Sequence, residues 1–126
     1  MSDQFDVVNK AKHYNGHPSG IEAKHILRCL NFNMGSALKY VMRRHGKEYD
    51  RSLKSAAFYL RDQEENQPKA VVDKKVHMLL VQYQRHEIDP LVSEFYARVN
   101  SYLLTPQAEM MEDIIRVVEE IRIHGR

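Results

Sequence analysis

The chain has 126 residues, of which 43% are hydrophobic and 29% are charged, a composition typical of one globular domain with a single core. No apolar run approaches the roughly 20 residues that cross a bilayer, and Met1–Lys12 lacks the pattern of a secretory signal. We therefore expect a cytoplasmic protein without a membrane partner. The single cysteine, Cys29, excludes an internal disulfide and lies in an apolar stretch, which predicts that it is buried.

The net charge of +2 is distributed unevenly along the chain. Residues 1–63 hold 11 Lys and Arg against 6 Asp and Glu, whereas residues 64–126 hold 8 against 11. A basic first half attracts anions, whether these are nucleotides, nucleic acids or acidic proteins. Charge alone leaves these three partners open.

The first 20 residues contain Gly16, Pro18 and Gly20 with little periodicity, which predicts an irregular arm. The segment Ser19-Gly20-Ile21-Glu22 matches a capping box, in which the Ser side chain bonds the N–H of Glu22 and the Glu side chain reaches back. This pattern predicts a first helix over residues 21–30.

Two more helices are expected in the basic half. Asn33 is the expected cap of a helix that ends near Gly46, and its apolar residues recur at helical spacing: Met34, Ala37, Leu38, Val41 and Met42. Asp50 is the expected cap of the next helix, which ends in the polar run 62–67 and buries Leu53, Ala56, Ala57 and Leu60.

Pro68, Pro90 and Pro106 mark the starts of three further helices, because proline is tolerated in a first helical turn. Each following segment has a helical apolar stripe: Val72, Val76, Leu79, Leu80 and Tyr83; Val92, Phe95, Tyr96, Val99, Tyr102 and Leu103; Met111, Ile114, Ile115, Val118 and Ile121. No segment has the pattern of a strand.

The sequence thus predicts an all-α, single-domain bundle of about six helices. It would comprise an arm over residues 1–20, basic helices over 21–63 and acidic helices over 68–126. The last helix could pack on its own domain or serve as a dimerisation helix in a homo-oligomer.

Lys39, Arg43 and Lys47 are spaced by four residues in the second expected helix, opposite its apolar stripe. This spacing predicts a cationic ridge that could clamp phosphate oxygens, with Arg44, Lys54 and Arg61 nearby. The alternative interpretation is a solvated helix face without a ligand.

The loop over residues 13–20 leads into a helix N-terminus, where free N–H groups favour anions, and it supplies His13, Tyr14 and His17 for stacking or hydrogen bonding. An ordinary surface loop explains the same pattern. The histidines lack metal-ligand spacing, so we expect no zinc site; Glu112 and Asp113 offer only a weak candidate for Mg²⁺. A Walker-type phosphate loop is absent from the sequence.

The order of several residues resembles a small phage and prophage family catalogued as a domain of unknown function. The resemblance covers about residues 8–62 and is carried by His13-Tyr14, Ile21-Glu22, Phe32 with Gly35, Lys39-Tyr40, Arg43, Lys47, Leu53, Ala56 and Tyr59-Leu60. The chain departs from the family pattern at Ala11, Ser36, Ser52 and Ser55.

That family includes the nucleotide kinase of phage T-seven, so the resemblance implies nucleotide binding and, if the chain is a kinase, the use of ATP and Mg²⁺. It further implies a shared nucleotide site composed of His13, Tyr14, Glu22, Gly35, Lys39, Tyr40, Arg43 and Lys47. Ser52 and Ser55 stand where the family pattern has an Asp and a Lys, which weakens the case for catalysis more than that for binding.

Two other functions remain open at this point. The same cations could serve a non-enzymatic phage protein that sequesters a nucleotide signal or inhibits a host factor. They could also belong to a nucleic-acid-binding or dimeric interaction module, in which the ridge meets backbone phosphates.

Overall fold

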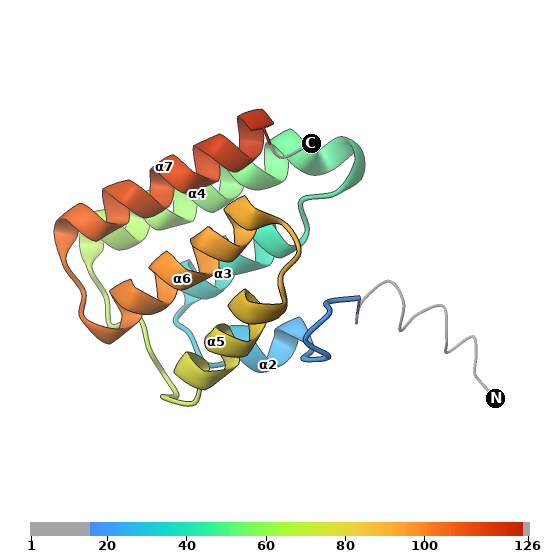
Figure 1. Cartoon of the computed structure of the whole chain (residues 1–126). Coiled ribbons are helices and arrows are strands. Elements are labelled where there is room, and N and C mark those ends of the chain that lie inside the picture. Colours follow the sequence, from blue (N-terminus) through green and yellow to red (C-terminus); the bar gives the residue numbers. More distant parts are fainter. Residues whose placement is uncertain (1–15, 125–126) are drawn as a thin grey trace.

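The computed structural model describes residues 16–124, which are 73% helical and contain six α-helices (Figure 1). The all-α, single-domain bundle is therefore confirmed. The elements in chain order are α2 (Ala23–Leu27), α3 (Phe32–Met42), the short 3₁₀ helix η1 (Gly46–Glu48), α4 (Tyr49–Asn66), α5 (Val76–His86), α6 (Pro90–Leu104) and α7 (Ala108–His124).

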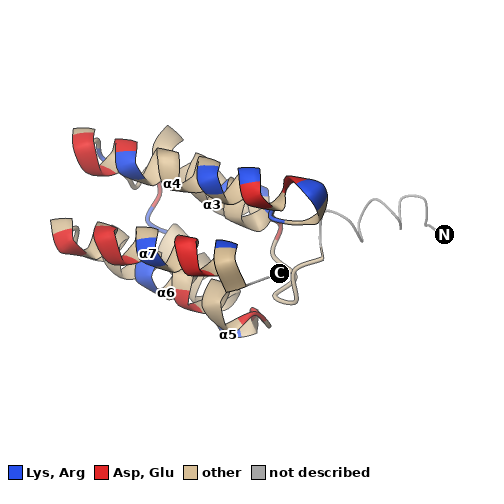
Figure 2. Ribbon diagram, turned by 90° about the horizontal axis from the view of Figure 1, so that it is seen from above, with Lys and Arg blue, Asp and Glu red and all other residues tan. Residues whose placement is uncertain are grey.

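The helices form two layers, with α3 and α4 in one and α5, α6 and α7 in the other (Figure 2). The core lies between the layers, and its largest fully buried side chains are Tyr96, Phe95, Ile26, Met34, Leu38, Leu53, Leu60, Leu80, Met111, Ile114 and Ile121. Helix α7 packs on α4 and α6, so the last helix buries its apolar stripe within its own chain. Within the described residues, no helix combines the length and apolar character that a membrane span requires.

The start of the first helix differs from the expectation. The Ser19 hydroxyl accepts a hydrogen bond from the N–H of Ile21 at 3.1 Å, and the Glu22 side chain makes no capping bond. The capping-box prediction was wrong because Ser19 is instead part of a tight turn with His17. Helix α2 has only five residues, from Ala23 to Leu27, and is followed by a turn that ends at the buried Leu30.

The cap of α3 is Asn31, two residues before the expected Asn33. Its side-chain oxygen accepts the N–H of Met34 at 2.8 Å, while its amide nitrogen donates to Gln63 Oε1 at 2.9 Å and to the carbonyl of Lys69 at 3.0 Å. Asn33 is itself buried within α3. The cap is thus fixed by contacts from distant parts of the chain.

Helix α3 ends at Met42, four residues before the expected end, and this separates the predicted cationic ridge. Arg43 is the C-cap, and Gly46 has a φ of +72°, which turns the chain into η1. Lys47 lies in η1, so it does not continue the face of Lys39 and Arg43. The prediction of one ridge on one helix was therefore wrong. Helix α4 then begins at Tyr49, with Glu48 at the cap position where Asp50 was expected.

The segment after Pro68 is not helical until Val76. Val71 instead forms an isolated antiparallel bridge with Leu30, and Val72 is 71% exposed, so Val72 does not belong to the buried helical stripe that was expected. The expected helices at Pro90 and after Pro106 are present, and the Asp89 carboxylate accepts the N–H groups of Leu91 and Val92.

Candidate ligand-binding cavity

A cavity of about 920 Å³ opens where the segment before α2, the end of α3 and the α5–α6 turn meet. Its volume lies within the range usual for small-molecule sites. The polar lining comes mainly from His17, Glu22, Lys24, Lys39, Arg43, Arg44, His45, Glu87 and Asp89, and the apolar lining comes from Pro18, Ala23, Leu27, Met42, Tyr83, Ile88 and Tyr96. The cavity therefore has charged and aromatic walls.

The polar base of the cavity is centred on Arg44. Its guanidinium donates to the carbonyl of Val41 at 2.8 Å and lies 3.8 Å from Glu87 Oε2 and 4.0 Å from Asp89 Oδ2. The side chains of Arg44 and Glu87 are only 11% and 6% exposed. Such a buried charge cluster persists only when its members are paired, so Arg44 is committed to holding the α5–α6 turn.

His17 connects the segment before α2 to this cluster. Its Nδ1 accepts the N–H of Ser19 at 3.1 Å, so the proton resides on Nε2, which donates to Glu87 Oε1 at 3.1 Å. Burial lowers the pKa of His17 below its usual value of 6.5, and this effect exceeds the opposing effect of Glu87. The neutral imidazole follows from both the bonding pattern and the pKa.

Two buried tyrosines form the aromatic wall. The rings of His17 and Tyr83 stack with centroids 3.6 Å apart and planes 2° apart, and Tyr96 meets Tyr83 edge-on at 5.3 Å. Burial raises the pKa of Tyr83 to about 12 and raises that of Tyr96 further, so both hydroxyls stay protonated at neutral pH. Because Tyr83 and Tyr96 are only 3% and 1% exposed and His17 covers a face of Tyr83, the two rings support the cavity from behind and leave little aromatic surface for a ligand.

Lys39 and Arg43 are the cations of the cavity that no acid among residues 16–124 neutralises. Neither side chain forms an ion pair with another residue of the described part of the chain. By contrast, Lys24 lies 3.5 Å from Glu22, and Arg44 is paired with Glu87 and Asp89. Arg43 is exposed, and Lys39 is half-buried with its Nζ 4.7 Å from the centroid of the Tyr40 ring. These two side chains can therefore bind an external anion.

The structure divides the residues that the family resemblance assigns to one site. Glu22, Lys39 and Arg43 line the cavity. Lys47 lines a separate surface hollow of about 620 Å³ on η1 and α4. His13 and Tyr14 lie outside the described residues.

Gly35 and Tyr40 are also away from the cavity lining. A Cβ on Gly35 would lie 3.4 Å from the carbonyl oxygen of Leu27, so this glycine is in the contact between α2 and α3. Tyr40 stacks against Tyr59 of α4, with ring centroids 6.1 Å apart. Both residues support the packing of α3 and do not contact the cavity space.

The comparison with known proteins gives no relative for this chain. Neither a family model, nor a curated protein, nor a solved structure matches it. The function is therefore argued from the cavity itself and from the residue pattern in the sequence.

Several lining residues were not identified as site residues from the sequence. Tyr83 and Tyr96 belong to apolar helical stripes and were interpreted as core. Glu87 and Asp89 precede Pro90, and their pattern indicates only a helix start. Two acids that are separated by one residue and followed by a proline, with a tyrosine in the apolar stripe on each side, are the signal that could have indicated a polar junction here.

The acidic pair considered for Mg²⁺ is engaged within the protein. Asp113 forms ion pairs with Arg98 and Arg116, and Glu112 bonds Glu64, which raises the pKa of the Glu64 carboxyl above its usual value. Among residues 16–124, no group of three or more His, Cys, Asp or Glu side chains is arranged to hold a metal ion.

Proposed function

We propose that the protein binds a nucleoside phosphate, or a closely similar phosphate-bearing small molecule, in the cavity between α2, α3 and the α5–α6 turn. The observation that carries this proposal is the pair Lys39 and Arg43, which line the cavity without an ion-pair partner among the described residues. Arg binds phosphate oxygens in a bidentate manner and Lys as a point charge.

The other wall suits the base and the sugar of such a ligand. Leu27 and Ile88 provide apolar lining for a base, and the cavity volume of about 920 Å³ accommodates a ligand with both an aromatic and a charged part. The residue pattern of the phage and prophage family supports the same ligand class, because Glu22, Lys39 and Arg43 belong to that pattern and line this cavity.

A thermal-shift panel of nucleosides and their mono-, di- and triphosphates tests the proposal. A ligand that binds only the folded state raises the melting temperature, so at least one phosphorylated compound should stabilise the protein while its nucleoside does not. If inorganic phosphate alone raises the melting temperature as much as the nucleotides do, the protein recognises the phosphate group and not the nucleoside. No shift with any phosphorylated compound at millimolar concentration would refute the proposal.

The family resemblance extends the proposal to phosphoryl transfer, and the same samples test this extension. A monophosphate that stabilises the protein is incubated with ATP and Mg²⁺, and the products are separated by anion-exchange chromatography. New diphosphate, formed with an equal amount of ADP, identifies a kinase. Stable binding without product identifies a nucleotide-sequestering protein and leaves the binding proposal intact.

A further inference from the structure

Four aromatic rings gather on the face formed by α3 and α4, outside the cavity described above. Tyr59 is at the centre, with ring centroids 5.5 Å from Phe32, 5.2 Å from Phe58 and 6.1 Å from Tyr40. We call these four residues the aromatic cluster. Phe32 and Phe58 are 74% and 64% exposed, so their faces are presented to solvent.

Exposed phenylalanines packed into one cluster are unusual on a small protein and mark contact surfaces. Scattered single apolar residues need no such explanation. Here two helices contribute to one continuous aromatic surface, and the buried sides of α3 and α4 already supply the core. Tyr40 and Tyr59 pack against the core, so Phe32 and Phe58 are the members of the cluster that core packing does not account for.

Cations flank the aromatic cluster along α4. Arg51, Lys54, Phe58 and Arg61 recur at helical spacing, and all four are exposed. Phe58 also lines the surface hollow on η1 and α4, where it is accompanied by Lys47, Arg51 and Lys54. On the other side, Nζ of Lys39 lies over the Tyr40 ring. The aromatic rings thus have positive charges at both edges.

The hollow is lined by three cations and two acids, so its lining keeps a net positive charge although Arg51 and Lys54 are paired. Asp50 contacts Lys54 at 3.2 Å but also accepts a hydrogen bond from Arg122 of α7 at 2.9 Å. Glu48 pairs with Arg51 at 3.3 Å, and both of those side chains are more than half exposed. Exposed pairs of this kind are weak and can exchange partners readily. An incoming anion can therefore compete for Arg51 and Lys54.

We propose that the α3–α4 face binds single-stranded nucleic acid, with bases stacking on Phe58 and Phe32 and backbone phosphates contacting Arg51, Lys54 and Arg61. Exposed aromatic faces between cations are the combination that single strands require, because every base has a face that stacks and every linkage carries a negative charge. An acidic protein partner would satisfy the cations but would not need planar rings. None of these five residues lines the nucleotide cavity, although Lys39 borders both surfaces.

Fluorescence anisotropy with a labelled 12-nucleotide oligothymidylate tests the proposal. We expect binding at low salt that weakens steadily as salt is added, and weaker binding of a duplex, whose bases are already stacked. Phe58→Ala should weaken binding at least about fivefold, the effect of losing one stacked base. Lys54→Gln should weaken binding. It should also reduce the slope of log affinity against log salt concentration by about one, the effect of losing one phosphate contact.

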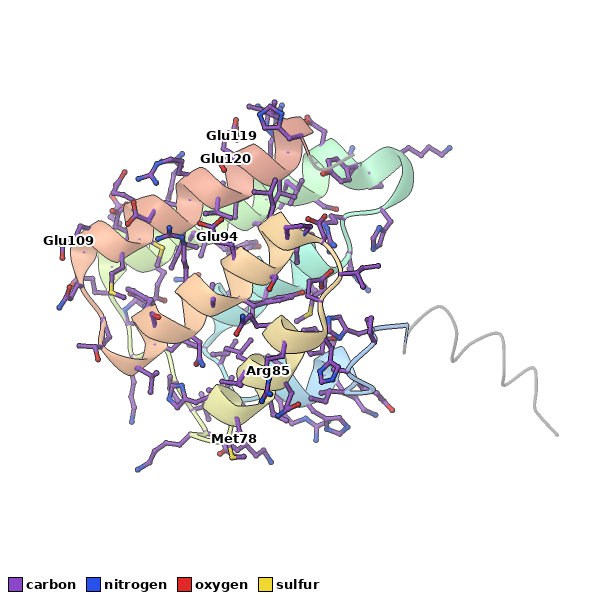
Figure 3. The ribbon with its side chains drawn as sticks, viewed as in Figure 1. Met78, Arg85, Glu94, Glu109, Glu119 and Glu120 are labelled. Carbon is purple, nitrogen blue, oxygen red and sulfur yellow. The ribbon has the colours of Figure 1, made fainter. Side chains whose placement is uncertain are left out.

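Three further variants make the result specific. Phe58→Leu keeps the apolar bulk but lacks the aromatic face, so it should resemble Phe58→Ala. Met78→Ala removes an apolar side chain that is 74% exposed and projects from α5 at the edge of the molecule (Figure 3), and it should bind like the original protein. Arg43→Ala, which weakens nucleotide binding in the cavity, should leave oligonucleotide binding within about twofold, so that the two proposals fail independently.

Three outcomes would overturn the proposal. The first is absence of oligonucleotide binding at low salt by a protein with an unchanged melting temperature. The second is full binding by Phe58→Leu, which would show that apolar bulk and not stacking matters. The third is a concentration-dependent dimer, seen by sedimentation and lost in Phe58→Ala, which would assign the surface to a second copy of the chain.

Discussion

His17 and Glu87, 70 positions apart in the chain, are joined by a hydrogen bond of 3.1 Å at the edge of the cavity. This bond ties the segment before α2 to the α5–α6 turn, and Arg44 from the end of α3 meets the same carboxylate. One acidic side chain thus holds three parts of the fold that are distant in sequence. The shape of the cavity depends on this junction.

Removing the Glu87 carboxylate should destabilise the protein. In Glu87→Ala, the Nε2–H of His17 loses its acceptor, and the buried Arg44 keeps the Val41 carbonyl but has only Asp89, 4.0 Å away, as an acidic partner. Unsatisfied buried groups of this kind cost about 1–3 kcal/mol. Urea denaturation measures the loss, and Glu109→Ala, an exposed acid at the start of α7 (Figure 3), is the matched control that should change stability by less than about 0.5 kcal/mol. Equal stability of the two variants would contradict the role of the junction.

The lowered pKa of His17 makes stability depend on pH. The unfolded chain gains a proton on this imidazole near its usual pKa of 6.5, whereas the folded protein gains it only at lower pH. The unfolded state then binds more protons, so the free energy of unfolding decreases as pH falls below 6.5 toward the folded pKa. Burial and Arg44 also lower the pKa of His45, which contributes with the same sign.

His17→Gln should therefore show a flatter stability profile between pH 7 and about pH 5 than the original protein. Denaturation curves at several pH values in that range measure both profiles. His45→Gln provides a comparison in which His17 still titrates. Parallel profiles for the original protein and His17→Gln would rule out a neutral, buried imidazole at this position.

Asn31 should be more important for stability than its position in a turn suggests. Asn31→Ala removes both the cap of α3 and the two bonds to Gln63 and the Lys69 carbonyl, and loss of a cap alone typically costs about 1 kcal/mol. Asn31→Ser keeps a capping oxygen but lacks the amide donor, so its stability should lie between that of the original protein and that of Asn31→Ala. Thermal melting orders the three proteins; a serine variant as unstable as the alanine variant would show that the cap contributes little.

A substitution at Gly35 tests whether this residue serves the contact between α2 and α3, as the structure shows, or the nucleotide site, as the family resemblance implies. Because Gly35 lies in a helix and has room for a Cβ at 3.4 Å from the Leu27 carbonyl, Gly35→Ala should fold at least as stably as the original protein. It should also bind nucleotides unchanged, since Gly35 does not line the cavity. A larger side chain, as in Gly35→Leu, should push against α2 and lower the melting temperature. Loss of ligand affinity in a stable Gly35→Ala variant would place this residue in the site after all.

Apolar periodicity was sufficient to predict most of the fold. Leu38, Val99 and Ile114 are fully buried, as their spacing predicts, because apolar residues at helical spacing lie on one face of the helix and that face packs against the core. Helix ends were less predictable. Asn33 and Asn31 are both acceptable caps, and only the bonds from Asn31 to the chain around residues 63–69 favour one of them.

The cavity was only partly predictable for a similar reason. Lys39 and Arg43 were expected to attract an anion, and both line the cavity. Lys47 was expected beside them, but the turn at Gly46, with its positive φ, moves it to another hollow. Glu87 could not be foreseen as their neighbour, since its contacts come from segments far away in the sequence.

The most direct test of the nucleotide proposal is a calorimetric titration of matched variants with the nucleotide that stabilises the protein most. Arg43→Ala and Lys39→Gln each remove a cation that lines the cavity and should weaken binding about tenfold or more, because charge-assisted bonds to phosphate contribute roughly 1.5–3 kcal/mol. Lys47→Gln removes an equal charge from the separate hollow and should bind nearly as well as the original protein. If Lys47→Gln loses affinity while Arg43→Ala and Lys39→Gln retain it, the cavity is not the nucleotide site.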